Sequence, residues 1–235
     1  MNKTFCISAV LIMAALFLDI SCAPVYRPTV LNAPMFRSQG QIKLSGHSSM
    51  AGYEVQGAAA VSDHIGVVVN SVVAANSSAE EEHNGETVKI KNKTRQLEGG
   101  LGVYHAFRSG VVTELYAGYG YAYSRTLSDE GPSPDVVEAT YHRFYAQPAL
   151  GFVDDYFEVG LAVRVLHLNA FEYHDYSNGD TDPHSGTFVE PVIFMRVGFR
   201  QLKLEGQLGA SIIRSGDIDY IPLIASVGIL YSFSL

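Results

Sequence analysis

The sequence predicts an all-β fold: an antiparallel up-and-down transmembrane β-barrel of about ten strands, with eight as the alternative. Three observations predict it. After Ser38, apolar residues alternate with small or polar residues, with a period of two. Short and long connections alternate along the chain, and charged residues gather on one face of each strand. Short turns at one end and long loops at the other, with an even strand count, are typical of outer-membrane barrels.

The first residues have the pattern of a secretory signal peptide. A positive start at residues 1–3 precedes the apolar run 5–17, which is too short to span a bilayer comfortably, and small residues follow it. We therefore predict a signal peptide over residues 1–21 and an exported protein. Because Cys6 leaves with the signal, the mature chain has one cysteine and forms no internal disulfide.

Cys22 stands where a lipidated cysteine would begin the mature chain. Ile20 and Ser21 suit the two positions before such a cysteine, but Asp19 occupies a position where an apolar residue is expected. We predict lipidation of Cys22. The alternative is cleavage nearby by an ordinary signal peptidase, which leaves Cys22 free or removes it.

Residues 22–38 contain Pro24, Pro28 and Pro34 and show no apolar period. They predict an extended periplasmic tether. Residues 39–235 then form the barrel. The chain has 24 acidic and 16 basic residues and a net charge of −8, which excludes nucleic acid as a partner because such binding needs a basic surface.

The alternation defines ten candidate strands, separated by tight turns or by long polar connections. The strand spans are 39–47, 52–62, 65–76, 93–107, 110–126, 139–153, 156–173, 186–199, 201–214 and 221–235. The long connections are 77–92, 127–138 and 174–185. Pro148 and Pro191 fall within strands, where each removes a ladder donor, and we expect them to mark bulges.

One face of the strands carries six acidic and five basic residues, whereas the opposite face carries essentially no charge. The eleven residues are Lys43, Glu54, Glu98, Glu114, Arg143, Glu158, Arg164, Glu190, Arg196, Lys203 and Glu205. A soluble barrel has an apolar lumen and charges in water, so this distribution places the charges inside and lipid outside. In a narrow barrel such charges pair and fill the space, and we expect a structural network. The alternative is a pore with a water path past the arginines.

Aromatic residues on the apolar face form two groups, one near each end of the strands. Phe107, Phe152, Phe199 and Phe233 lie toward the short turns, and Tyr53, Tyr121, Tyr123 and Phe171 lie toward the long loops. Two aromatic girdles separated by aliphatic residues match the two membrane interfaces.

The chain resembles the small outer-membrane β-barrel lipoproteins of Bacteroidota-type bacteria. The resemblance lies in SCAPVYRPTVLNAPMF before the first strand, GYEVQGAAAVSDHIGVVVN, LEGGLGVYHAF and the final LYSFSL. It implies a barrel in the bacterial outer membrane with both termini periplasmic and no assigned reaction. No charged signal of the kind that marks surface-exported lipoproteins follows Cys22, so the resemblance implies a lipid in the inner leaflet.

The long connections are acidic and lie on one rim. Their acidic residues are Glu80, Glu81, Glu82, Glu86, Asp129, Glu130, Asp135, Glu138, Asp175, Asp180, Asp182, Asp217 and Asp219. One connection offers oxygen ligands that suit calcium, from Asp175, Asn178, Asp180 and Asp182, but solvated loops explain the composition equally well. We assign no metal and no cofactor.

A rim hydrolase, acting on lipid A or on peptides, is a further alternative. His174, His184 and Ser185 share one connection, and Tyr141 and His142 open a nearby strand. A nucleophilic serine needs a base within hydrogen-bond reach and an orienting carboxylate, which adjacency in a loop does not supply.

We assign no catalytic residue and expect a non-enzymatic role in envelope structure or surface interaction, through the acidic extracellular loops. The expected partners are outer-membrane lipid, lipopolysaccharide and the barrel insertion machinery.

Overall fold

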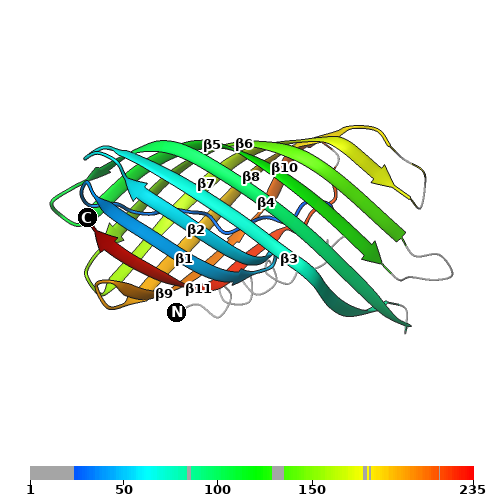
Figure 1. Ribbon diagram of the computed structural model, residues 1–235, viewed down its shortest axis with the longest axis horizontal. Coiled ribbons are helices and arrows are strands. Elements are labelled where there is room, and N and C mark those ends of the chain that lie inside the picture. Colours follow the sequence, from blue (N-terminus) through cyan, green and yellow to red (C-terminus); the bar gives the residue numbers. More distant parts are fainter. Residues whose placement is uncertain (1–23, 84–85, 129–134, 177–178, 180, 217) are drawn as a thin grey trace, which may run out of the picture.

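The structure, a computed structural model, describes residues 24–83, 86–128, 135–176, 179, 181–216 and 218–235. It is all-β, and its strands tilt around an elongated barrel (Figure 1). The strands are β1 (Gln41–Ser49), β2 (Gly52–Ala60), β3 (Ile65–His83), β4 (Glu86–Ala106), β5 (Val111–Ser128), β6 (Asp135–Val153), β7 (Phe157–Asp175), β8 (His184–Gly198), β9 (Leu202–Ala210), β10 (Ile212–Gly216) and β11 (Leu223–Ser234). No helix among these residues is long and apolar enough to cross a membrane.

The sheet closes on itself. Neighbouring strands pair antiparallel from β1 to β8, β9 pairs with both β8 and β11, and β11 pairs with β1. β9 and β10 follow each other along β8 and fill one place in the ring. The structure therefore confirms the predicted closed antiparallel barrel of ten strands rather than eight.

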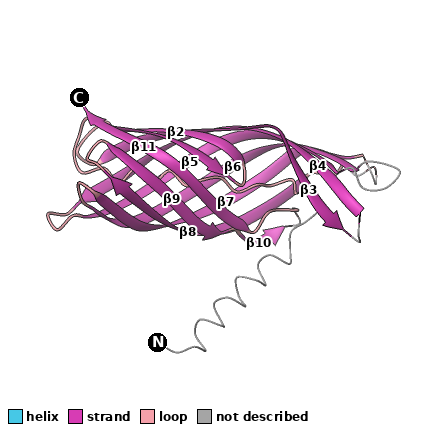
Figure 2. Ribbon diagram, turned by 90° about the horizontal axis from the view of Figure 1, so that it is seen from below, coloured by secondary structure: helices cyan, strands magenta, loops and turns pink. Residues whose placement is uncertain are grey.

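The barrel has two different mouths. One end, which we call the C-terminal mouth, holds Leu235 and the turns that follow β2, β4, β6 and β8 (Figure 2). The other end, which we call the hairpin mouth, holds the connections that follow β1, β3, β5, β7 and β10. The β3–β4 and β5–β6 pairs extend farther at the hairpin mouth than the β1–β2 pair does (Figure 1).

Two of the predicted long connections are shorter than expected. β3 and β4 remain paired from Ser77 and Asn92 to His83 and Glu86, although we predicted a loop over 77–92. The register sets Glu80 opposite Lys89 in this extension. Polarity alone therefore did not mark a loop here. β5 and β6 likewise extend to Ser128 and from Asp135 into the predicted connection 127–138.

The two strand prolines interrupt ladders without forming bulges. β6 and β7 lose pairing next to Pro148, yet Ala146–Val165 and Ala149–Ala162 keep one register on the two sides of the gap. The gap between β9 and β10 lies opposite Pro191, again without a register shift. A missing N–H removes a hydrogen bond and need not insert a residue. The predicted bulges at these prolines are wrong.

The exterior wall is apolar. Large apolar side chains point outward along the strands, including Val55, Leu97, Leu101, Phe144, Leu150, Ile193, Leu204 and Val227, each more than half exposed. Exposed aromatic side chains lie near both ends of the wall. Those nearer the C-terminal mouth are Phe107, Phe152 and Phe199, and those nearer the hairpin mouth are Tyr53, Tyr121 and Phe171. Such a surface is unfavourable in water and suits lipid.

Residues 24–36 lie inside the barrel and do not form an external tether. They are extended, and all are buried except Arg27, which is half-buried. We call them the plug segment; in Figure 1 they are the dark blue trace that runs inside the strands. The sequence led us to expect an extended periplasmic tether over residues 22–38, whereas residues 24–36 run through the lumen.

The plug segment also separates the two ends of the described chain. Thr126, near the end of β5, donates to the Pro24 carbonyl at the hairpin mouth, whereas the Leu235 amide donates to the Gly40 carbonyl at the C-terminal mouth. Pro24 and Leu235 therefore lie at opposite mouths of the barrel, whereas the sequence led us to expect both termini in the periplasm.

Candidate functional site: the lumen and its plug segment

All eleven charged residues expected on the inner face point into the lumen. None of them is more than 5% exposed, and Arg143, Arg164 and Glu190 are fully buried. They sit at alternating strand positions, so the pleat directs each side chain inward while its neighbours face outward.

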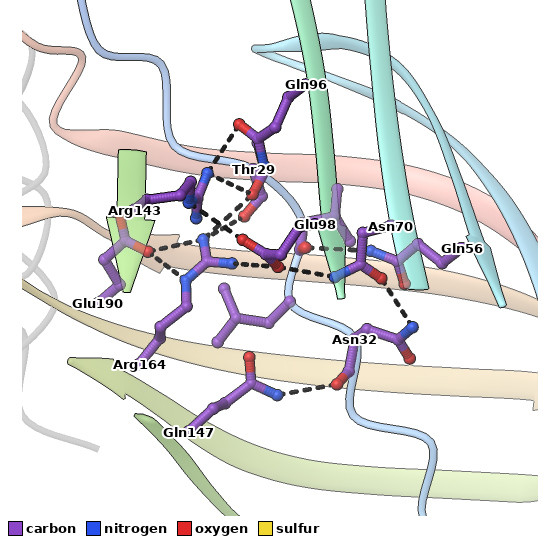
Figure 3. A network of polar contacts seen from close by, with 12 residues as sticks. Thr29, Asn32, Gln56, Asn70, Gln96, Glu98, Arg143, Gln147, Arg164 and Glu190 are labelled. Carbon is purple, nitrogen blue, oxygen red and sulfur yellow. Dashed lines mark hydrogen bonds and ion pairs between the residues drawn. The ribbon is translucent and has the colours of Figure 1, made fainter. Parts of the chain in front are cut away.

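Four of these residues form an ion cluster in the middle of the lumen, which we call the central cluster: Glu98, Arg143, Arg164 and Glu190 (Figure 3). Arg143 pairs with Glu98 at 3.0 Å, and Arg164 pairs with Glu190 at 2.7 Å. Arg164 also lies 4.0 Å from Glu98. Two acids and two bases from β4, β6, β7 and β8 thus compensate one another where water is excluded.

A second ion cluster lies nearer the C-terminal mouth and consists of Lys43, Glu158, Arg196, Lys203 and Glu205. Glu158 accepts from Arg196 at 2.8 Å and from Lys203 at 2.7 Å, and Lys43 lies 3.5 Å away. Arg196 also binds Glu205 at 2.9 Å. These pairs tie four strands, β1, β7, β8 and β9, together through buried charge.

The two other lumen acids bind the backbone of the plug segment. Both carboxylate oxygens of Glu54 accept from the Val30 amide, at 3.1 Å each. Glu114 accepts from the Met35 amide at 2.9 Å. A carboxylate that accepts from a backbone N–H makes a charge-assisted hydrogen bond, which is stronger than a neutral one.

Neutral side chains of the wall bind the plug backbone in the same way. Gln207 accepts from the Leu31 amide at 3.1 Å and donates to the Leu31 carbonyl at 2.8 Å, as a neighbouring strand would. Gln56 donates to the Val30 carbonyl at 3.0 Å, and Gln147 donates to the Asn32 carbonyl at 2.8 Å.

The cations of both clusters complete this set. Arg164 donates to the Thr29 carbonyl at 2.9 Å, Arg196 to the Ala33 carbonyl at 2.8 Å, and Lys43 to the Met35 carbonyl at 3.3 Å. Arg164, Arg196 and Lys43 therefore each hold the plug segment as well as an acidic partner. A buried carbonyl without such a partner would destabilise the fold by about 1–3 kcal/mol.

The sequence of the plug segment suits this environment. Pro24, Pro28 and Pro34 have no N–H, so they reduce the number of buried donors that the lumen must satisfy, and they favour an extended chain. Met35 has a left-handed backbone with φ of 53°. Its amide and carbonyl are both held, by Glu114 and Lys43, which maintains this strained conformation.

Apolar side chains of the plug segment pack against the wall at both ends of the lumen. The Tyr26 ring lies 4.7 Å from that of Phe188, centroid to centroid, and its hydroxyl donates to Glu190 at 2.6 Å. Leu31 and Met35 join an apolar cluster with Phe194 of β8 and Val112 of β5. The segment is thus held by packing as well as by hydrogen bonds.

Glycines in β5 make room for large side chains in the lumen. A Cβ on Gly120 would lie 2.8 Å from Cγ of Arg143, and one on Gly118 would lie 2.4 Å from the Tyr145 ring. Both glycines occupy inward positions, where any side chain would displace the central cluster or the aromatic ring beside it.

Sequence reasoning identified the charges but missed the polar residues that hold the plug segment. Gln56, Gln147 and Gln207 lie at inward positions with the same alternation as the charged residues, and that shared position was the available signal. The high apolar content of residues 25–36 was a second signal, because a solvated tether has no use for Val25, Tyr26, Leu31 and Phe36.

The calcium and lipidation candidates lie largely outside the described residues. Cys22, Asn178 and Asp180 are not described, and Asp175 and Asp182 each have an interaction partner. Within the part of the chain that the structure describes, no group of three or more His, Cys, Asp or Glu residues could hold a metal ion.

The hydrolase candidates do not converge. His184 and Ser185 are consecutive residues of β8, so their side chains leave opposite faces of the sheet. Nδ1 of His184 lies 2.6 Å from the Asp182 carbonyl. His142 stacks on Phe171 at 4.5 Å on the outer wall, whereas Tyr141 is buried inside.

No protein-family model and no curated protein matches the sequence. Among solved structures, the chain is similar to a loop L8 deletion mutant of OmpT, an outer membrane protein of Vibrio cholerae. The identity is 11%, the match covers 78% of this chain and 63% of that one, and the TM-score is 0.25. The transport unit of the autotransporter AIDA-I from Escherichia coli is 10% identical over 94% of this chain and 97% of that one, with a TM-score of 0.29. The barrel described above rests on the strand register of this chain and not on these comparisons.

A cross-linking experiment tests the position of the plug segment. Nδ2 of Asn32 lies 2.8 Å from Oδ1 of Asn70 inside the lumen, so the variant N32C/N70C should be joined by a short bis-alkylating thiol reagent. Mass spectrometry of a digest measures the link. The variant N32C/V69C is the control, because Val69 neighbours Asn70 on β3 but faces outward and is 50% exposed. Equal linking in both variants would contradict the lumenal position.

A second prediction concerns the central cluster. Arg164→Gln leaves Glu190 and Glu98 without their shared cation and should lower the free energy of unfolding by about 3–5 kcal/mol. Urea unfolding of the purified protein in lipid vesicles measures the change. The double variant R164Q/E190Q should recover part of the loss. Arg200→Gln, which removes a 75% exposed partner of Asp155, should cost less than about 1 kcal/mol. Equal losses in R164Q and R200Q would refute the assignment.

Proposed function

We propose that this protein is an outer-membrane β-barrel whose lumen is closed by its own N-terminal segment, with a non-enzymatic role in envelope structure or surface interaction. One observation carries the proposal: the wall of the barrel binds the plug backbone from Thr29 to Met35 through charged and amide side chains. Because the plug segment occupies the lumen, we expect the barrel not to conduct ions.

The proposed location is supported by the outer surface and by the predicted signal peptide. The exterior is apolar over the length of the strands, whereas buried charge lies inside, so lipid is the medium that suits the wall. An exported chain with an antiparallel barrel of even strand number belongs in the bacterial outer membrane. Insertion would then use the barrel insertion machinery.

The two alternatives lose support for different reasons. A narrow pore requires the plug segment to leave the lumen. The cations that bind its carbonyls and the two acids that bind its amides would then lose these hydrogen-bond partners. A rim hydrolase requires His184 and Ser185 to meet, and consecutive strand residues cannot do so without a bend.

The closed lumen predicts a silent barrel in conductance measurements. Wild-type protein in planar bilayers should show no steady current. The variant E54A/Q207A loses the side chains that bind the Val30 and Leu31 backbone, so it should open intermittently. Gln96→Ala is the control, because Gln96 accepts from Arg143 and not from the plug backbone.

Adding the N32C/N70C cross-link to E54A/Q207A should abolish its openings, since the link holds the plug segment against β3. Steady current through the wild-type protein would overturn the proposal. Openings that persist after cross-linking would show that the current does not depend on the plug segment.

The proposed lipopolysaccharide partner is supported by a basic stripe on the outer wall. Lys91, Lys93 and Arg95 alternate along the outward face of β4, and Arg125 of β5 is the register neighbour of Lys93. Leu97 and Leu101 continue the same face into the apolar wall. Bases directly above a lipid-facing surface match the phosphates of an anionic leaflet, at about 1 kcal/mol each.

Lipid analysis tests this stripe. K91Q/K93Q/R95Q should retain less lipopolysaccharide per barrel than wild type when the protein is purified in mild detergent, as measured by lipid phosphate. The control is R37Q/R108Q/R200Q, which removes three exposed bases at the opposite mouth. An equal loss of lipopolysaccharide in both variants would contradict a specific role of the stripe, because net charge alone would then explain the retention.

A further inference from the structure

The plug segment enters the lumen at a defined place, the hairpin mouth. There the Val25 and Tyr26 amides both donate to the Asp219 carbonyl at 3.0 Å, and the Ile221 amide donates to the Tyr26 carbonyl at 3.2 Å. Tyr26 forms a parallel bridge with Tyr220. The first residues of the segment are therefore held against the β10–β11 connection.

The other end of the plug segment leaves the lumen at the C-terminal mouth. The Arg37 amide donates to Gln41 at 2.7 Å, and the Gly40 amide donates to the Ala60 carbonyl at 2.9 Å. Gly40 in turn accepts from the Leu235 amide, so the start of β1 and the end of β11 lie together. The segment thus crosses the whole barrel, against the direction in which β1 runs.

The reach of the chain limits where the residues before Pro24 can go. Two residues extend at most about 7 Å, whereas the apolar band of a barrel in the outer membrane is about 25 Å tall. With the plug segment seated, Cys22 cannot reach the interface at the C-terminal mouth. A lipid on Cys22 and a seated plug segment are compatible only at the hairpin mouth.

We propose that the amino terminus of the mature chain is displayed on the cell surface, so that an acyl chain carried by Cys22 would insert into the outer leaflet. The proposal rests on the proposed function, because it requires an outer-membrane barrel. Bacterial outer-membrane barrels have short turns at the periplasmic end and longer hairpins and loops outside. All turns at the C-terminal mouth are short, whereas the long β3–β4 and β5–β6 hairpins extend at the hairpin mouth, which places the C-terminal mouth inside and the hairpin mouth outside. The inner-leaflet anchor implied by the family resemblance is then excluded by the path of residues 24–36.

This arrangement gives the barrel a surface anchor that is independent of its strands. Pro24 is held by Thr126, and Val25 and Tyr26 are held by the β10–β11 connection, so the exit point is fixed by hydrogen bonds. An acyl chain at that terminus would meet the outer leaflet that surrounds the same barrel.

Two epitope tags test the proposal in intact cells. One tag is inserted between Ala23 and Pro24, and a matched tag is appended after Leu235. Antibody labelling of intact cells is compared with labelling of lysed cells for each protein. We expect the N-terminal tag to be labelled equally before and after lysis and the C-terminal tag to be labelled only after lysis. The N32C/N70C cross-link, formed in the same tagged protein, reports that the plug segment is seated.

Three results would overturn the inference: an N-terminal tag protected until lysis, both tags labelled on intact cells, or a C-terminal tag alone labelled on intact cells. Fractionation separates this failure from failure of the proposed function. A protein absent from the outer-membrane fraction defeats the proposed function, whereas a protein present there with a protected N-terminal tag defeats only the inference.

Lipid placement has its own readout. Intact mass of the protein from outer membranes reports acylation, and Cys22→Ser is the unacylated control. In C22S the N-terminal tag should remain on the surface, because the plug segment and not the lipid determines the path. Loss of surface labelling in C22S would contradict that reasoning.

Discussion

The structure depends on how the hydrogen-bonding groups of one extended segment are satisfied inside a closed barrel. Val25 and Tyr26 pair with the backbone of residues 219–221. From Thr29 to Met35 the segment instead depends on side chains of the wall to satisfy its amides and carbonyls. Glu54, Gln207, Gln56, Gln147 and Arg164 supply those partners at 2.8–3.1 Å. The wall therefore recognises the segment through its backbone, and the prolines of the segment reduce what must be recognised.

Charge compensation and backbone binding are carried by the same side chains. Arg164 pairs with Glu190 and donates to Thr29, and Arg196 pairs with Glu158 and Glu205 and donates to Ala33. A buried ion pair alone is weak support for stability, because desolvation offsets its attraction. Here the remaining donors of each cation also bind the plug segment, so the plug segment and both ion clusters stabilise one another.

Alternation in the sequence was sufficient to predict the strands and to place residues such as Glu98, Arg143 and Arg196 inside, because a strand with one lipid face and one polar face has a period of two. The plug segment has no such period, since an extended chain enclosed on every side has no outer face to mark. Its role was therefore not visible from periodicity, and its prolines suggested a tether. The β3–β4 extension was missed for a related reason: outside the membrane, a paired strand can be polar on both faces.

Amide hydrogen exchange of the purified, full-length protein in lipid or detergent tests the central claim most directly. If the wall holds the plug backbone, the amides of Val30, Leu31 and Met35 should exchange as slowly as those of β7 and β8, because opening them requires the surrounding hydrogen bonds to break. Exchange of these three amides at the rate of an unstructured chain, while the strands remain protected, would show that the segment does not occupy the lumen.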